Sequence, residues 1–222
     1  MCFSATASLV AGGTLGSVGI LTLRRVRSCN ELPFAAIPLL FGIQQVLEGL
    51  VWLSFNYPVS NHFATYTYAV FSHFLWPVLI PISVCLLERN RVRSVILRIF
   101  SAVGIVVGLY LLYFVVTEPT VPKILSQSIA YDSPHHYSYL TTSIYLMTIV
   151  GSCLLSSWRL INLFGIILFV LFAIAAWFYT AMLVSVWCFF AAILSAIVYL
   201  FFIKLEKNQL SIFGSFLDKS SI

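Results

Sequence analysis

Glu48 is the only charged residue that lies in the middle of a hydrophobic segment of this sequence. Two adjacent amides, Gln44 and Gln45, precede it in the run 43–52. An ionisable side chain costs several kcal/mol inside lipid, so such residues face protein or water and mark functional sites by default. A carboxylate beside two carboxamides can hydrogen-bond a small polar ligand or hold a cation. The first candidate site is therefore centred on Glu48.

Helical spacing predicts that these polar groups share one face of a helix. Gln44, Glu48 and Trp52 are four residues apart, and Gln45 comes three residues before Glu48. In a helix that runs outward, Glu48 lies roughly 6 Å beyond Gln44, because each residue adds about 1.5 Å. We therefore expect Glu48 in the outer half of the membrane, with Trp52 as an apolar or cation–π wall.

A second group of residues lies around Pro77. His73 and Trp76 are three residues apart and share a helix face. Proline has no amide hydrogen, so Pro77 frees the carbonyl four residues earlier, which belongs to His73. A freed carbonyl inside a membrane survives where protein or a polar cavity satisfies it. We predict an outward-facing pocket lined by Gln44, Gln45, Glu48, Trp52, His73 and Trp76.

Two cysteines extend the candidate site toward metal chemistry. Cys2 lies at the outer mouth of the first apolar segment, and Cys188 lies in the last one at a depth similar to that of Glu48. Together with Glu48 and His73, these thiols could ligate zinc or copper. The alternative is structural: Glu48 hydrogen-bonds the glutamines and holds helices together, while His73 and the cysteines only pack.

The composition predicts an integral membrane protein. Of the 222 residues, 61% are hydrophobic and only 9% are charged, far below the roughly 25% of soluble domains. The mean hydropathy is +1.02. The formal charge of +5 would favour acidic partners in a soluble protein. Here the basic residues lie between apolar segments, so the lipid bilayer is the expected partner and nucleic acid is not.

Seven segments are long and apolar enough to span a bilayer, which needs about 20 residues. They are 4–23, 33–55, 63–87, 95–116, 139–157, 160–179 and 182–203. Eleven of the twelve Lys and Arg residues then fall on one side, and only Lys123 falls on the other. Positive charge accumulates on the cytoplasmic side. We therefore predict an all-α bundle of seven transmembrane helices with an external N-terminus and a cytoplasmic C-terminus.

The predicted domain organisation is simple. Residues 1–204 form one membrane domain, with 117–138 as an external loop and 205–222 as a cytoplasmic tail. Small residues recur on the first and fourth spans: Gly12, Gly13, Gly16, Gly19, Gly104 and Gly108. Such positions allow helices to approach closely. Packing within the chain is the first expectation, and an oligomer through these glycine-containing faces is the second.

Three stretches resemble an uncharacterised family of small bacterial polytopic membrane proteins. They are the start Met-Cys-Phe-Ser-Ala at 1–5, the run Ile-Pro-Leu-Leu-Phe-Gly-Ile-Gln-Gln at 37–45, and Ser-Val-Trp-Cys-Phe-Phe-Ala-Ala at 185–192. The resemblance extends over the whole chain and implies a multi-pass protein of a bacterial inner membrane. It implies no activity, ligand or cofactor.

Two known seven-span classes do not fit the pattern. Microbial rhodopsins need a lysine midway along the last span, whereas Lys204 lies at its inner end. Ceramidase-type hydrolases carry two histidines four residues apart in the last span, and this segment has none. The leading hypothesis is a protein that binds or transports a small polar ligand or cation. A metal-dependent intramembrane hydrolase, with Glu48 as ligand or general base, and a structural or assembly subunit stay open.

Overall fold

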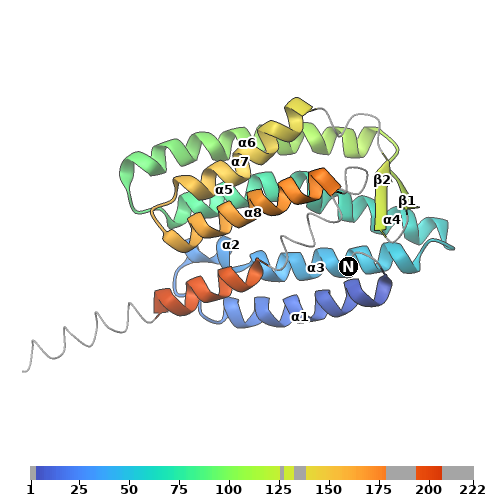
Figure 1. The fold of residues 1–222 in the computed structure, drawn as a ribbon, viewed down its shortest axis with the longest axis horizontal. Helices are drawn as coiled ribbons and strands as arrows, with labels where there is room; N and C mark the ends of the chain where they lie inside the picture. Colours follow the sequence, from blue (N-terminus) through green and yellow to red (C-terminus); the bar gives the residue numbers. More distant parts are fainter. Residues whose placement is uncertain (1–3, 126–127, 133–138, 179–193, 207–222) are drawn as a thin grey trace, which may run out of the picture.

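The computed structural model describes residues 4–125, 128–132, 139–178 and 194–206. Its helices lie side by side with their axes roughly aligned, and the turns lie at the two ends of this bundle (Figure 1). The helices are α1 (Ala5–Leu23), α2 (Leu32–Ala35), α3 (Ile37–Leu53), α4 (Pro58–Val70), α5 (Trp76–Leu87), α6 (Arg91–Thr117), α7 (Tyr139–Leu155) and α8 (Arg159–Phe178). A 3-10 turn, Cys29–Glu31, precedes α2, a π-helical turn η2 (Phe71–Leu75) joins α4 to α5, and residues 195–206 are helical. The predicted all-α class is confirmed.

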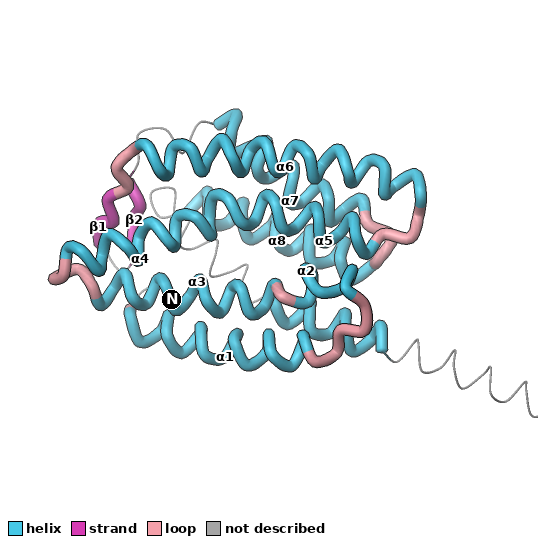
Figure 2. Tube along the Cα trace, turned by 180° about the vertical axis from the view of Figure 1, so that it is seen from behind, coloured by secondary structure: helices cyan, strands magenta, loops and turns pink. Residues whose placement is uncertain are grey.

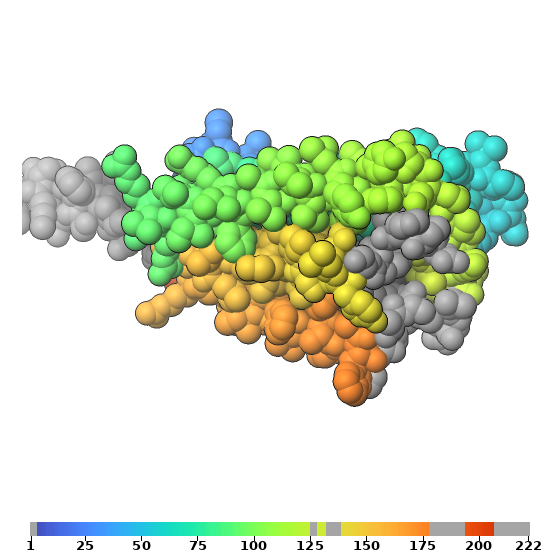
Figure 3. Space-filling model, turned by 90° about the horizontal axis from the view of Figure 1, so that it is seen from above, coloured from blue at the N-terminus to red at the C-terminus, as the bar shows by residue number. Residues whose placement is uncertain are grey.

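Five helical segments of the described chain are long and apolar enough to cross a membrane. They are Ala5–Leu23, Cys29–Leu53, Pro58–Leu87, Arg91–Thr117 and Arg159–Trp177. The helix α7 is apolar but shorter, and only part of the predicted span 182–203 falls among the described residues. Along one face α6 and α7 lie side by side, and α8 follows α7 (Figure 3). Length and composition together make this a membrane protein.

Glycines hold α1 and α3 at short range. A Cβ atom on Gly12 would lie 2.6 Å from Val46 Cγ2, and one on Gly42 would lie 2.7 Å from the amide nitrogen of Gly16. These distances leave no room for a side chain, so the helices pack backbone to backbone. The expectation of packing within the chain is confirmed for Gly12. By contrast, a Cβ atom on Gly13 would meet nothing within 4 Å.

Glycines also allow α5 and α6 to pack closely. Gly104 lies against the carbonyl oxygen of Pro77, closer than a side chain would allow. One turn further along α6, a Cβ atom on Gly108 would lie 2.9 Å from Val78 Cγ2 and 3.2 Å from the carbonyl oxygen of Phe74. The predicted role of Gly104 and Gly108 in close packing is therefore confirmed, and it sets the position of α5.

The external loop predicted at 117–138 contains a β-hairpin that the sequence interpretation missed. The strand β1 (Val121–Leu125) pairs antiparallel with β2 (Ser128–Asp132), with Ile124 opposite Ile129. Prolines in this stretch indicated a loop. Pro122 is nevertheless accommodated, because a strand of a two-stranded sheet has an edge on which no amide hydrogen is needed. The hairpin lies at the end of the bundle where α3 ends and α4 begins (Figure 2).

At the opposite end of the bundle, Glu88 joins two turns. Its Oε1 accepts hydrogen bonds from the Asn90 amide at 2.8 Å and the Ser157 hydroxyl at 2.6 Å, and its Oε2 accepts from the Ser157 amide at 2.7 Å. Partial burial raises the pKa of Glu88, but the hydrogen bonds from Ser157, Asn90 and Arg89 together outweigh it, so the pKa is lowered. The carboxylate thus fastens the α5–α6 turn to the α7–α8 turn.

Glu88→Gln should weaken this junction, because an amide –NH₂ cannot accept the bond that Oε2 receives. We expect the free energy of unfolding to fall by about 1 kcal/mol, less than the roughly 1.5–3 kcal/mol of buried charged hydrogen bonds, since water reaches this turn. The folded-state pKa lies below the ordinary 4.5. The stabilisation by the Glu88 carboxylate is therefore complete above the ordinary value of 4.5. It is lost as the pH falls through the folded-state pKa.

Thermal unfolding in detergent at about pH 7 and about pH 3 checks both statements. Wild type and Glu88→Gln should differ at the higher pH, and the difference should become smaller at the lower one. Ser157→Ala, alone and combined with Glu88→Gln, is the control, because the two changes should not be additive. A difference that is the same at both pH values would show that the carboxylate charge contributes nothing.

Candidate functional site

The helix α3 carries the polar residues of the candidate site into the protein interior. Gln44, Gln45 and Glu48 each have 0% of their surface exposed. Another face of the same helix presents Gly42 and Val46 to α1. Because that contact fixes the rotation of α3, the polar stripe is buried in protein and does not meet lipid. A membrane helix accommodates a carboxyl group in this way.

Gln44 and Trp76 are brought together from α3 and α5. The indole Nε1 donates to Gln44 Oε1 at 2.7 Å, and the indole ring stacks on Phe41 with 3.9 Å between ring centroids. An indole N–H only donates, so the carboxamide oxygen faces Trp76 and the –NH₂ group of Gln44 is directed elsewhere. Phe41 was not predicted, although it lies three residues before Gln44, a spacing that places both on one side of the helix.

His73 lies in the π-helical turn η2 and is buried. Its Nδ1 lies 3.0 Å from the carbonyl oxygen of Ala69 and 2.8 Å from the hydroxyl of Ser72. A carbonyl oxygen only accepts, so Nδ1 carries the hydrogen, and in the neutral ring Nε2 is the basic nitrogen. His73 can therefore accept a proton or a hydrogen bond, or ligate a metal, through Nε2.

A π-helical turn lies just before Pro77, so the hydrogen bonds here do not all follow α-helical spacing. Hydrogen bonds of a π-turn run over five residues, and the carbonyl oxygen of Ser72 receives its hydrogen bond from a side chain. The donor is Tyr145 of α7, whose hydroxyl donates to the Ser72 carbonyl oxygen at 2.8 Å. The predicted free carbonyl at His73 assumed α-helical spacing and stays a prediction. Tyr145, 73 residues further along the chain, gave no spacing signal.

The candidate residues of α3 face those of the α4–α5 segment at successive levels along the bundle. The helices α3 and α4–α5 run in opposite directions (Figure 1), and the bond between Gln44 and Trp76 fixes their register. One turn nearer the hairpin, α3 carries Glu48 and the facing segment carries His73. A turn of helix is about 5.4 Å, so the carboxyl and the imidazole lie at the same depth.

Several buried polar atoms here have no hydrogen-bond partner among the described residues. They are Gln44 Nε2, Gln45 Nε2, Gln45 Oε1 and Trp52 Nε1. Leaving such a group unpaired costs about 1–3 kcal/mol, and buried polar groups of native proteins are almost always paired with protein, water or ligand. The arrangement therefore offers two –NH₂ groups, an indole N–H and a carbonyl oxygen close to the carboxyl of Glu48.

Aromatic residues cover the site on the side of the β-hairpin. Tyr131 of β2 stacks on Tyr68 of α4, with 4.7 Å between ring centroids and an interplanar angle of 13°. These rings form an apolar cluster with Ile129 and Val51, and Trp52 packs against it. Val51 follows Glu48 by three residues, so the cluster lies about one helical turn nearer the hairpin than the carboxyl. Trp52 belongs to this cover, and the sequence interpretation did not foresee the contribution of the hairpin.

The predicted metal ligands fall only partly on described residues. Glu48 and His73 are described, whereas Cys2 and Cys188 lie outside the described ranges. Among residues 4–125, 128–132, 139–178 and 194–206, no three His, Cys, Asp or Glu side chains are grouped so that they could hold a metal ion. The zinc or copper site stays a prediction.

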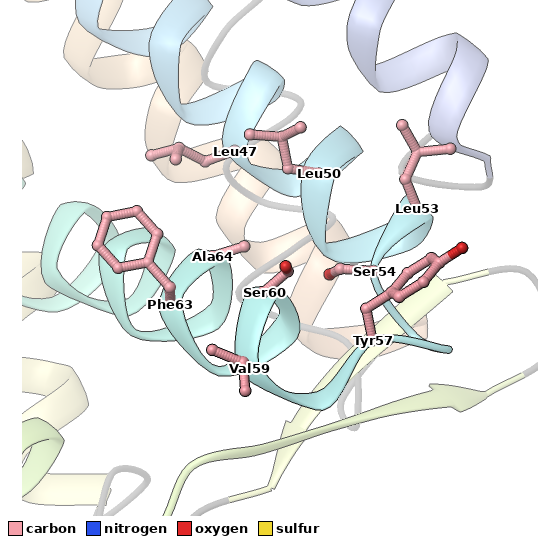
Figure 4. Close-up of a pocket in the computed structure, with 9 residues that line it drawn as sticks. All are labelled: Leu47, Leu50, Leu53, Ser54, Tyr57, Val59, Ser60, Phe63 and Ala64. Carbon is pink, nitrogen blue, oxygen red and sulfur yellow. The ribbon is translucent and has the colours of Figure 1, made fainter.

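A recess on the flank of the bundle is distinct from the predicted pocket. It lies between the end of α3 and the start of α4 (Figure 4), and none of the six predicted residues lines it. Leu47 does line it, although Leu47 is the neighbour of Glu48. Consecutive residues of a helix point about 100° apart, so Leu47 faces the recess while Glu48 belongs to the buried polar stripe.

Comparison with known proteins yields one assignment. No curated protein and no solved structure matches the chain significantly. A family model matches residues 1–211, which is nearly the whole chain, and its description is that of a family of unknown function. The buried polar stripe on α3 lies inside the matched region. The chain belongs to the family of unknown function DUF6629.

Proposed function

We propose that the protein binds or transports a small polar ligand or cation at an outward-facing intramembrane site around Glu48. The main observation behind this proposal is the environment of the Gln45 side chain. This side chain has no exposed surface, and neither its nitrogen nor its oxygen has a hydrogen-bond partner among the described residues. A dry, unpaired carboxamide would cost about 1–3 kcal/mol. A bound polar molecule that pairs with both atoms accounts for its presence one turn from a buried carboxyl.

The chemistry of the buried atoms narrows the ligand class. Gln44, Gln45 and Trp52 offer N–H donors, and Gln45 Oε1 offers an acceptor. This set favours a molecule with a carbonyl, carboxylate or hydroxyl oxygen and with one donor or positive group that Glu48 would receive. A bare cation is served less well, because Gln44 has committed its oxygen to Trp76.

The proposed topology has seven spans, with the N-terminus outside and the C-terminus in the cytoplasm. The helix α7 and the helix of 195–206 would complete the five long apolar segments. Basic residues on the turns at the end away from the hairpin support this orientation: Arg24, Arg25, Arg27, Arg89, Arg91, Arg93 and Arg159. The hairpin, which carries Lys123, would face outward. The resemblance to bacterial proteins makes an inner membrane the proposed location.

Gln45→Leu distinguishes a ligand site from a polar pair that only holds helices together. Leucine keeps a similar volume and removes both polar atoms. We expect the mutant to lose roughly tenfold or more in ligand affinity, the equivalent of one hydrogen bond of about 1.4 kcal/mol. Small molecules released by denaturing the purified full-length protein, identified by mass spectrometry, measure the bound amount.

Gln44→Leu is the matched control, because it leaves the Trp76 N–H without its acceptor. That change should lower the free energy of unfolding by about 1–3 kcal/mol whether or not a ligand binds. If the carboxamide of Gln45 has no ligand, Gln45→Leu removes an unpaired polar group and the protein becomes more stable by a similar amount. A stabilised Gln45→Leu protein with unchanged bound small molecules would refute the proposal.

A further inference from the structure

The recess between α3 and α4 has a volume of about 580 Å³ (Figure 4). Two small side chains, Ser60 and Ala64 of α4, leave space between the larger Leu47 and Leu50 of α3 and Phe63 of α4. The recess lies on the flank of the helix pair, on a different side of α3 from the polar stripe. It therefore has room for an occupant of its own.

The lining of the recess is apolar and open to the surroundings of the bundle. Leu50 is 43% exposed, Phe63 is 72% exposed and Val59 is 86% exposed. These residues belong to Cys29–Leu53 and Pro58–Leu87, both long and apolar enough to cross a membrane. In a bilayer such side chains meet hydrocarbon and not water. The occupant that can reach and fill this space is a hydrocarbon chain.

The polar residues of the recess, Ser54, Tyr57 and Ser60, lie near the point where the chain turns from α3 into α4. The Ser54 hydroxyl already donates to the Val51 carbonyl oxygen and accepts from Asn61, so Tyr57 and the start of α4 supply the polar groups open to an occupant. The helix α4 starts at Pro58, and no side chain caps its first turn. The first amide N–H groups of a helix have no partner within the helix, and they carry partial positive charge that attracts phosphate and ester oxygens. An apolar recess with such an end matches an amphiphile.

We propose that this recess is a specific site for one phospholipid of the outer leaflet. Its acyl chain lies between Leu50 and Phe63, and its ester or phosphate oxygens meet the start of α4. Tyr57 stands at the same end, at the level where tyrosine side chains border lipid headgroups. The leaflet follows from the proposed orientation, whereas the site itself holds even if nothing binds near Glu48.

The test uses the full-length protein in vesicles of phosphatidylethanolamine and phosphatidylglycerol. A small fraction of the phosphatidylglycerol carries a photoactivatable diazirine in its acyl chain, and labelled peptides are mapped by mass spectrometry after illumination. We expect labelling of residues 47–64 to exceed that of α6 around Ile105 and Val106 about tenfold. Those two residues are apolar and are 40% and 67% exposed, so they report ordinary surrounding lipid.

Ser60→Trp fills the recess from an exposed position and leaves the core untouched. Ala102→Trp, at an exposed small residue of α6, is the matched control. Labelling of the recess should fall about tenfold in Ser60→Trp and stay unchanged in Ala102→Trp. Even labelling of α4 and α6 in wild type, or recess labelling that persists in Ser60→Trp, would mean surrounding lipid only and would overturn the site.

Discussion

Glu48→Gln should lower the ligand affinity of the intramembrane site roughly a hundredfold and leave the protein folded. Removing one partner of a buried, hydrogen-bonded charge pair costs about 2–5 kcal/mol, and about 2.8 kcal/mol corresponds to two powers of ten. Glutamine matches the shape of glutamate and carries no charge to desolvate, so the fully buried position tolerates it. The protein should therefore stay folded.

The measurement compares wild type and Glu48→Gln, both purified without a metal-binding tag. Released small molecules are identified by mass spectrometry, and zinc and copper are measured by elemental analysis. The control is Glu206→Gln, which removes a carboxylate that pairs with Arg25 and Arg27 at the end of the bundle away from the hairpin and should leave the bound ligand unchanged. Equal ligand content in wild type and Glu48→Gln would contradict the role of Glu48.

Two further outcomes of this comparison separate the alternatives. About one equivalent of zinc or copper in wild type, lost in Glu48→Gln, would favour the metal-dependent hydrolase, with Cys2 and Cys188 as the next ligands to replace. A wild-type protein that carries neither metal nor small molecule, and that co-purifies with a stable protein partner, would favour the structural or assembly subunit.

Gly104→Ala should cause the largest loss of stability of any glycine-to-alanine change among the described residues. The new Cβ atom would overlap the carbonyl oxygen of Pro77 and would lie 3.0 Å from Thr148 Cγ2. A carbonyl inside a helix cannot move alone, so α5 or α6 must shift as a whole. Overpacking of this kind costs about 1–3 kcal/mol and occasionally more, and we expect the upper end of that range.

Gly13→Ala is the matched control, because the same methyl group on α1 meets nothing within 4 Å. Alanine is favoured over glycine in a helix by about 1 kcal/mol, so Gly13→Ala should be neutral or slightly stabilising. Thermal unfolding of both variants in the same detergent measures the difference. A Gly104→Ala protein as stable as Gly13→Ala would show that α5 and α6 do not pack this closely.

The sequence was sufficient to find the polar stripe of the candidate site, for an energetic reason. A carboxyl and two carboxamides are so unfavourable in lipid that their positions on α3 carry information even without a structure. Helical periodicity then places Gln44, Gln45 and Glu48 together, and all three are buried. The long apolar segments and the glycine contacts were predictable in the same way, from hydropathy and from small residues at helical spacing.

What the sequence could not supply were features that depend on partners far along the chain or on a local change of helical register. The Ser72 carbonyl oxygen in the π-turn η2 accepts from the distant Tyr145, and no residue type in Phe71–Leu75 signals such a turn. The stacking of Tyr131 on Tyr68 joins an external segment to α4. Alternating apolar residues in a stretch with three prolines were too weak a signal for strands.

The β-hairpin is attached to the bundle more lightly than any of the long helices. Its Ile129 and Tyr131 insert into a small cluster with Val51, Ala64 and Tyr68, which is separate from the main core. Segments with few buried contacts open locally at a free energy far below that of global unfolding. These two inserted side chains, at about 1.5–3 kcal/mol each, limit the lifted hairpin to at most roughly one molecule in 10² to one in 10⁴, and the buried Ser128 and Ala130 lower that fraction further.

Opening of the hairpin would control how fast a ligand exchanges between the proposed site around Glu48 and the surrounding medium. A ligand leaving by the outer end must wait for the rare molecules in which Tyr131 has left Tyr68, so its residence time would be set by the hairpin and not only by its own hydrogen bonds. Amide hydrogens of β1 and β2 would accordingly exchange with solvent long before those of α3.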